Sequence, residues 1–349
     1  MRAGRVDHPV SAWGLLAHHF AAPLAPRPGT GACMPSQSYQ SKTRAFPSLA
    51  LALLLAGTAL AGPAAAQTAV PLQRAASGHL LLPVTLEDSE PRLFILDTGA
   101  SHTAIAQTVA EEIGFVSQWQ TYDLVQSLNA RFDAERHQIN QLRVPGLDPV
   151  SVYSVIIPVP ADHPLPVAGL LGADAIDADR YEIDFDGLQL ILDSEPARHP
   201  DGQIERRGLL IGEARLRRRS ATVHVIIDTG SSHTLINRQL RRHLFDAGIQ
   251  FNVNVAVTGI EDADGEEARP VLIRQLQIGG LCVDQAPALQ SDLDVFDALG
   301  WADEPAMILG MDTLRHARIR VDRTAGVFEI SGTTEATRCN GNRVQMPGL

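Results

Sequence analysis

The chain has 349 residues, of which 45% are hydrophobic, and this length allows one large domain or two domains of ordinary size. Its formal net charge of −11 gives no general attraction to nucleic acid or to anionic lipid, so we expect neither as a partner. Cys33, Cys282 and Cys339 lack the spacing that is typical of a zinc site, and we expect no bound metal.

The N-terminal region has the pattern of an export signal. Two basic residues, an apolar run over 49–61 and an A-x-A pattern ending at Ala66 follow one another. We predict cleavage after Ala66; the alternative is a retained anchor, although the run is short and Ala-rich for a membrane span. Residues 1–33 fit no signal pattern, whereas a start at Met34 gives a signal peptide of ordinary length; Met1 and Met34 both stay open as the start, and 1–66 are treated as presequence.

Export places the mature chain in the periplasm or outside the cell. In such an oxidising compartment, the two cysteines that remain after cleavage, Cys282 and Cys339, form one disulfide or stay as two free thiols. The sequence leaves both alternatives open. No stable membrane span is expected in the mature chain.

After the presequence, one pattern occurs twice. In each copy an apolar strand leads into Asp-Thr-Gly, first at 97–99 and again at 228–230, and Ser-His-Thr and an apolar pair follow. A short helix is predicted after each copy, over 107–113 and 238–244. The glycine permits a sharp turn and close approach of the backbone. Each aspartate is therefore expected at the end of a buried strand.

A second block also occurs in both copies. An apolar-apolar-Gly sequence followed by an aspartate lies at 169–176 and at 307–314, and a strand ending in aspartate, a Gly turn and an apolar strand come next. Two blocks that match in order are stronger evidence for a repeat than one tripeptide. The additional aspartates of these blocks are Asp174, Asp312, Asp184 and Asp322. We interpret them as structural residues that form hydrogen bonds, cap helices or organise hairpin turns. The alternative is that they are extra acids in a site.

These repeats divide the chain into halves. We place the first half at 68–195 and the second at 203–332, with a linker rich in Pro, Gly and charge at 196–202. The polar segment 333–349 is expected to be a flexible tail. Short β-branched runs alternate with turn residues through both halves, so the fold class is mostly β, with two similar lobes.

Two copies of Asp-Thr-Gly, each between an apolar strand and an apolar-apolar-Gly block, resemble the aspartic peptidases of the retropepsin and pepsin type. The resemblance covers nearly all of 75–332, and each half is closer in size to a retropepsin-like unit than to a pepsin lobe. It implies an acid-protease β-barrel fold with two homologous lobes in one chain and a cleft between them. It also implies a monomer with an internal pseudo-dimer, a polypeptide substrate and no cofactor.

The resemblance also implies the site. Asp97 and Asp228 would meet at the lobe interface, share one proton and activate a water that attacks the scissile carbonyl. The threonines would interlock beneath them, and the apolar-apolar-Gly strands would lie beside the aspartate loops. The residues expected to support the pair are Thr98, Gly99, Thr229, Gly230 and Ser231.

The halves differ at the third position after the aspartate, which is Ala100 in the first copy and Ser231 in the second. In the family a serine here hydrogen-bonds the neighbouring carboxylate and favours its ionised form. Asp228 is therefore expected to be the ionised partner and Asp97 the protonated one.

Mobile hairpins, or flaps, are expected over the cleft. We place them near 125–133 in the first half and over 257–268 in the second, where polar and Gly residues suit a hairpin tip. The first lacks glycine, so the flaps are expected to be unlike. Ordinary surface loops are the alternative.

Two other functions stay open. One is a non-catalytic peptide-binding module that kept the fold, although a binding cleft has no need for two carboxylates that repel. The other is an active site completed by dimerisation. A single-chain site is favoured over it, because both halves retain Asp-Thr-Gly and the linker is short.

Overall fold

The computed structural model describes residues 10–11, 15–16, 67–115, 121–159, 167–205, 207–216, 222–244, 248–258 and 266–338. The predicted signal, its cleavage point and Cys339 lie outside these ranges. Among the described residues, no helix is both long and apolar enough to cross a bilayer. Strands dominate the secondary structure, as predicted.

The first of two sheets belongs mainly to the first half of the chain. Nine described strands form it, in the spatial order β2-β8-β9-β10-β7-β11-β6-β5-β4. In chain order they are β2 (Leu15–Leu16), β4 (Gln73–Arg74), β5 (Leu80–Leu86), β6 (Arg92–Leu96), β7 (Ala104–Ala106), β8 (Tyr122–Ser127), β9 (Arg131–Arg143), β10 (Val150–Ile157) and β11 (Gly169–Leu171).

The second sheet joins strands of both halves. Fifteen described strands form it, and most follow the order β1-β19-β20-β21-β17-β22-β16-β15-β14-β24-β23-β12-β13-β3, while β18 pairs with β20. They are β1 (Val10–Ser11), β3 (Thr68–Pro71), β12 (Arg180–Asp184), β13 (Gln189–Leu192), β14 (Gly202–Ile204), β15 (Leu210–Leu216), β16 (Val223–Ile227), β17 (Leu235–Ile236), β18 (Gly248–Gln250), β19 (Val255–Thr258), β20 (Glu266–Ile278), β21 (Leu281–Gln290), β22 (Ala306–Leu309), β23 (Ala317–Asp322) and β24 (Val327–Gly332).

The helices are short. Among the described residues they are α1 (Gln107–Glu112), α2 (Arg238–His243), α3 (Asp294–Ala298), α4 (Met311–Leu314) and the 3-10 turn η1 (Ala173–Ala175). The predicted helices after each Asp-Thr-Gly copy correspond to α1 and α2. Side-chain capping differs between them: Asn237 accepts the N–H of Leu240 at α2, whereas α1 has no side-chain cap.

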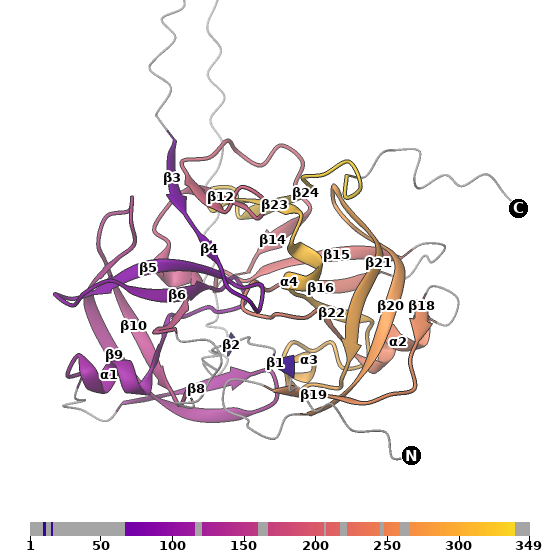
Figure 1. The fold of residues 1–349 in the computed structure, drawn as a ribbon, viewed down its shortest axis with the longest axis horizontal. Helices are drawn as coiled ribbons and strands as arrows, with labels where there is room; N and C mark the ends of the chain where they lie inside the picture. The colour runs from indigo at the N-terminus through magenta and orange to yellow at the C-terminus, as the bar shows by residue number, and fades with distance from the viewer. Residues whose placement is uncertain are drawn as a thin grey trace, which may run out of the picture. The chain divides into compact units, whose positions relative to one another are not determined.

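The repeat is visible in the pairing. In the first half β11 runs parallel to β6 and antiparallel to β7, and in the second half β22 has the same two relations to β16 and β17. Strand β10 likewise runs parallel to β7, and β21 runs parallel to β17. Figure 1 shows the first-half strands in indigo to magenta and their second-half counterparts in pink to orange. The two sequence copies therefore fold into equivalent units.

A shared group of strands joins the halves. Strand β12 of the first half pairs antiparallel with β23 of the second, and Tyr181 lies opposite Val321. Across this pair, Arg320 binds the buried carboxylate of Glu182 at 2.7 Å, and Arg318 binds Asp184 at 2.6 Å. A buried carboxylate is stable only when it is paired, so these contacts require the two halves to stay together.

Two of the recurring aspartates organise hairpins, as predicted. Oδ1 of Asp184 accepts the N–H of Gly187 at 2.9 Å, and Oδ1 of Asp322 accepts the N–H of Ala325 at 3.0 Å. The first of these turns connects β12 to β13, and the second connects β23 to β24. Asx-type bonds of this kind satisfy the backbone of a tight turn.

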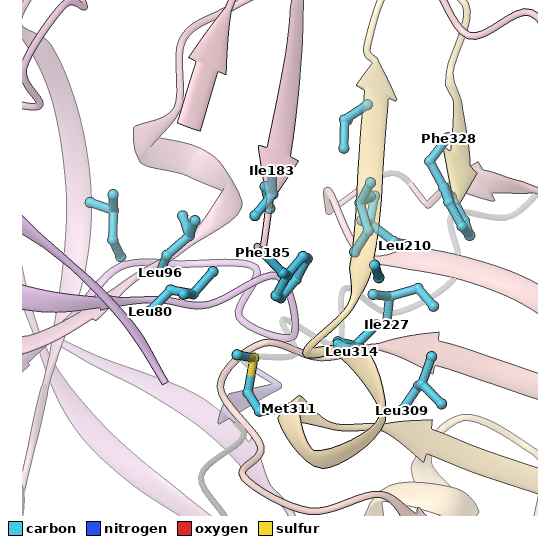
Figure 2. Close-up of a cluster of buried hydrophobic side chains, with 14 of the residues drawn as sticks. Leu80, Leu96, Ile183, Phe185, Leu210, Ile227, Leu309, Met311, Leu314 and Phe328 are labelled. Atoms are coloured by element: carbon cyan, nitrogen blue, oxygen red, sulfur yellow. The ribbon is translucent and has the colours of Figure 1, made fainter. Parts of the chain in front are cut away.

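The hydrophobic core is continuous through both halves and the joining strands. Figure 2 shows its centre, where side chains from all three regions gather. The labelled residues are Leu80, Leu96, Ile183, Phe185, Leu210, Ile227, Leu309, Met311, Leu314 and Phe328. Because this core does not divide at the linker, burial of apolar surface stabilises the pair of halves as one unit.

Residues 333–338, which the sequence analysis assigned to a flexible tail, are held by backbone bonds. Arg338 bridges to Leu281, and Thr337 accepts the N–H of Cys282 at 2.8 Å, so 333–338 fold back against β21. The structure records Cys282 in a disulfide whose partner lies outside the described residues. Backbone bonds to β21 explain why this polar segment is held despite its aperiodic sequence.

We expect Phe328→Ala to lower the free energy of unfolding by about 3–5 kcal/mol. The ring is fully buried and packs against Gly202 and Gly212, whose backbone cannot fill the space it leaves. Val253→Ala removes a side chain that is 57% exposed and is expected to stay within about 0.5 kcal/mol of the parent. Urea denaturation measures both, and a similar small loss in the two variants would contradict this packing.

Candidate active site

Each half presents one aspartate at the end of a buried strand. Asp97 follows β6 and Asp228 follows β16. The N–H of Asp97 donates to the carbonyl of Leu171 at 3.0 Å, and that of Asp228 donates to the carbonyl of Leu309 at 3.0 Å. The strands of the apolar-apolar-Gly blocks, β11 and β22, therefore lie beside the aspartate loops and hold them, as the resemblance implies.

The two threonines interlock across the halves. Oγ1 of Thr98 accepts the N–H of Thr229 at 3.1 Å and donates to the carbonyl of Ile227 at 2.8 Å. In return, Oγ1 of Thr229 accepts the N–H of Thr98 at 3.0 Å and donates to the carbonyl of Leu96 at 2.5 Å. All four bonds are buried, so each hydroxyl satisfies two backbone groups of the other half.

The glycines let the two loops touch. A Cβ on Gly99 would lie 2.4 Å from Cγ of Asp228, and a Cβ on Gly230 would lie 2.4 Å from Cγ of Asp97. Any side chain at either position would collide with the carboxyl of the opposite half. Each carboxyl group therefore packs directly on the other half's Asp-Thr-Gly turn, and the two aspartates, far apart in sequence, are neighbours.

This neighbourhood changes both carboxyl groups. Asp97 and Asp228 are 1% and 3% exposed. Burial raises the pKa of Asp97 well above its usual range, and the charge of Asp228 raises it further. Burial also raises the pKa of Asp228, to about 7. Two buried carboxyls with raised pKa values hold a proton between them more readily than two exposed ones.

One atom indicates where that proton lies. Oδ2 of Asp97 is buried, and it meets no donor in the part of the chain that the structure describes when both carboxyls are taken as ionised. A buried acceptor without a donor is costly. When the pair holds one proton, the protonated carboxyl of Asp97 donates to the carboxylate of Asp228, and that cost is relieved; this bond raises the pKa of Asp97 and lowers that of Asp228.

The backbone treats the two carboxylates unequally. Oδ1 of Asp228 accepts N–H groups from Gly230 at 2.8 Å and Ser231 at 3.1 Å. Oδ1 of Asp97 accepts the N–H of Gly99 at 2.8 Å. The N–H of Ala100 also lowers the pKa of Asp97, but by less than the N–H of Gly99 does. Donors to an ionised carboxylate favour that form. The two N–H bonds to Oδ1 of Asp228 therefore favour the ionised form of this carboxyl.

The serine after the second aspartate acts differently from our expectation. The hydroxyl of Ser231 donates to the carbonyl of His233 at 2.8 Å, so the side-chain bond to the carboxylate that the sequence suggested is not the one formed. The bond to Asp228 comes from the Ser231 backbone instead. A hydroxyl at this position competes for local carbonyls, and here the turn supplies a nearer one.

The recurring aspartates after the apolar-apolar-Gly blocks are structural. Oδ1 of Asp174 accepts both the N–H and the hydroxyl of Thr103, at 2.9 and 2.8 Å. Asp312 binds Thr234 in the same way, at 2.9 and 2.7 Å. These threonines belong to the Ser-His-Thr segments, so each aspartate locks the end of its own active-site loop.

Both predicted flaps are hairpins. In the first half, β8 and β9 are joined by a tight turn in which the N–H of Ser127 donates to the carbonyl of Ala130 at 2.9 Å. Its tip residue Leu128 is buried, and its carbonyl accepts the N–H of Val295, in α3 of the second half, at 3.2 Å. In the second half, β19 pairs with β20, and the tip at 259–265 lies outside the described residues.

The first hairpin contains a residue that the sequence analysis did not single out. Both amide atoms of Asn129, beside the buried tip, are themselves buried without a hydrogen-bond partner in the described structure. No local pattern marks this asparagine, because its burial comes from how the hairpin folds over the other half. Among the described residues, the second hairpin has no counterpart to Asn129, because its tip lies outside the described ranges.

Extended backbone lies along both hairpins. Residues 10–11 pair in parallel with β19, and residues 15–16 pair antiparallel with β8. Hydrogen bonding of a chain segment to a free strand edge is a common way of binding peptides. The edge of β8 therefore accepts an extended segment in the antiparallel orientation, and the edge of β19 accepts one in the parallel orientation.

No group of three or more His, Cys, Asp or Glu side chains arranged to hold a metal ion is found within the described ranges. The two-lobed β fold, the paired buried aspartates and the interlocked threonines together define the acid-protease type of site. The family model described as aspartyl protease matches residues 82–175 and again 214–313. Each match includes one of the two paired aspartates, Asp97 or Asp228, and together they cover more than half of the chain, which therefore belongs to the aspartyl protease family. Comparison with curated proteins gives no match.

We expect Thr98→Val to lower the free energy of unfolding by about 2–4 kcal/mol. Valine keeps the shape of the side chain but removes the hydroxyl that serves the N–H of Thr229 and the carbonyl of Ile227. Thr98→Ser retains the hydroxyl and is the matched control, with a loss expected below about 1 kcal/mol. Equal losses in guanidinium denaturation would show that the hydroxyl is not what joins the loops.

Proposed function

We propose that the chain is an aspartic endopeptidase that hydrolyses polypeptide substrates with a water activated between Asp97 and Asp228. The observation that carries this proposal is the pairing of two buried carboxyl groups, one from each half, whose shared burial favours a single proton on the pair. Membership of the aspartyl protease family supports it.

In the proposed reaction the two carboxyls have different roles. Asp228, with two backbone donors, is the ionised partner and takes a proton from the attacking water. Asp97, the protonated partner, hydrogen-bonds the carbonyl oxygen of the scissile peptide bond and stabilises the charge that develops there. The tetrahedral species then collapses as a proton passes to the leaving nitrogen, without a covalent adduct to the chain.

The substrate we propose is an extended polypeptide. Strand edges at β8 and β19 support this, because they already pair with extended backbone from 15–16 and 10–11. These residues precede both Met34 and the predicted cleavage point at Ala66, so the mature chain would have both edges open to a substrate. A non-catalytic peptide-binding module would use the same edges but has no need of the paired carboxyls.

We also propose that one chain is sufficient for activity. The interlocked threonines and the β12–β23 pair bring both aspartates together within one polypeptide, which supports a monomer. An active site completed by a second chain would instead leave each chain's own aspartates without their neighbour.

Asp97→Asn and Asp228→Asn should each reduce hydrolysis by about 100- to 10,000-fold, because each removes one of the two groups that move or hold the proton. The assay is release of fluorescence from labelled, denatured casein. Asparagine has nearly the same shape as aspartate, so thermal unfolding should show that both variants remain folded. Asp88→Asn, at an exposed turn, is the matched control and should keep parent activity.

The same variants separate the alternatives. A mixture of Asp97→Asn and Asp228→Asn chains should stay inactive if each site is built within one chain, whereas recovery of activity would support a site shared between chains. Casein that binds but is never cleaved by the parent chain would support the binding module. Cleavage that persists in both Asn variants would overturn the proposed mechanism.

The acid limb of the pH–rate profile should lie well above the pKa of about 3.9 of an isolated aspartate. Burial raises the pKa of Asp228 to about 7, and below that value the pair becomes doubly protonated and loses its base. The activity should therefore fall as the pH decreases through this region and be highest nearer to neutrality. An acid limb at or below about pH 4, measured as kcat/KM on a peptide containing a casein cleavage site, would contradict the burial argument.

A further inference from the structure

A buried histidine lies beside the second aspartate loop, at a position where the two halves differ. The turn at 75–79 is closed by a backbone bond of 2.9 Å between its first and last residues, and the turn at 205–209 is closed by the same bond at 2.9 Å. Each turn leads directly into a long strand, β5 or β15. His79 and Leu209 are therefore equivalent positions of the repeat, one polar and one apolar.

The side chain of His79 is fully buried, and both ring nitrogens have partners. Nε2 lies 3.0 Å from the carbonyl oxygen of Gly230, and Nδ1 lies 2.8 Å from Oγ of Ser77. A carbonyl oxygen can only accept, so Nε2 carries the hydrogen and donates it. Nδ1 of the neutral ring then accepts from the Ser77 hydroxyl. The side chain of Leu209, in the other half, has no hydrogen-bond donor.

The Gly230 carbonyl has a direct connection to the dyad. It belongs to the same peptide group as the N–H of Ser231, which donates to Oδ1 of Asp228 at 3.1 Å. A donor on the carbonyl side of a peptide group fixes its plane and polarises it, which strengthens the N–H on the other side. The order of contacts is Ser77, His79, the 230–231 peptide and then the carboxylate.

The first half lacks this arrangement. The corresponding peptide group joins Gly99 to Ala100, whose N–H donates to the backbone carbonyl of Asp97 at 3.4 Å and lowers the pKa of the Asp97 carboxyl. The side chain equivalent to the imidazole is that of Leu209, which is apolar. The imidazole therefore reaches across from the first half to support the second half's aspartate, and the support is not returned.

We propose that His79 is a positioning residue, which holds the 230–231 peptide so that its N–H stays on Asp228 and thereby makes the two members of the dyad unequal. This inference rests on the proposed function, since it assigns Asp228 the role of the base. A purely structural role for His79, in which it only satisfies a buried carbonyl, would support folding without affecting the chemical step.

Three variants distinguish these roles. His79→Leu copies the other half and removes the donor, His79→Gln keeps an N–H donor, and Ser77→Ala removes the partner of Nδ1 without touching the peptide. As a control for lost packing alone, Leu80→Val shortens the adjacent, fully buried side chain. The probe is a fluorogenic peptide containing the bond that the parent chain cleaves in denatured casein.

We expect His79→Leu to lower kcat by about 10- to 100-fold with KM nearly unchanged, as expected when one hydrogen bond to a charged group weakens. His79→Gln should restore kcat to within a few-fold of the parent, and Ser77→Ala should give a smaller loss. Leu80→Val should lower the melting temperature without this kcat effect.

The inference is overturned if folded His79→Leu keeps the parent kcat, if Leu and Gln variants lose kcat equally, or if the loss is confined to KM or to the folded fraction. If His79→Leu does not fold, His79→Gln and Ser77→Ala provide the test. A parent-like kcat in folded Ser77→Ala together with a large loss of kcat in folded His79→Gln would overturn the inference. Failure of the proposed function looks different, because the parent chain would then cleave no casein or Asp228→Asn would remain active.

Discussion

The fold depends on keeping two carboxyl groups together in a dry interface. Asp97 and Asp228 are nearly inaccessible to water, and two ionised carboxylates there would lack solvation and repel each other. Three features offset that cost: backbone N–H donors, the interlocked threonines and a proton held by the pair. The strands that join the halves, with their Arg–carboxylate contacts, keep the loops in place, so the interactions that stabilise the chain also hold the two carboxyls side by side.

The two members of the pair are chemically distinct although their loops are copies of one motif. The difference arises outside the Asp-Thr-Gly segments, in the peptide group that follows each of them and in what binds its carbonyl. Such a difference defines which carboxyl loses its proton first, and it requires only small changes in neighbouring residues. In this chain the halves differ in polarity at one such buried position, which is His79 in the first half and Leu209 in the second.

The repeat, the fold class and the residues of the paired loops could be predicted from the sequence, because each repeated residue makes the same local contacts in both copies. The hydrogen bonds of Asp174 and Asp312 follow from that logic as well. What the sequence could not predict depends on contacts between distant segments. His79 and Gly230 are 151 residues apart, and no local pattern states which loop an imidazole meets after folding. The hydroxyl of Ser231 was assigned to the wrong acceptor for a related reason: several acceptors lie within reach, and only the folded turn selects one.

The linker between β13 and β14 has a consequence for how such a protein can change over generations. In an assembly of two identical chains, every substitution appears on both sides of the symmetry axis, so an improvement on one side must be tolerated on the other. Joining the halves in one polypeptide removes that restriction. Each copy can then acquire residues of its own, and an ancestral pair of equal acids can become a pair with fixed and separate tasks.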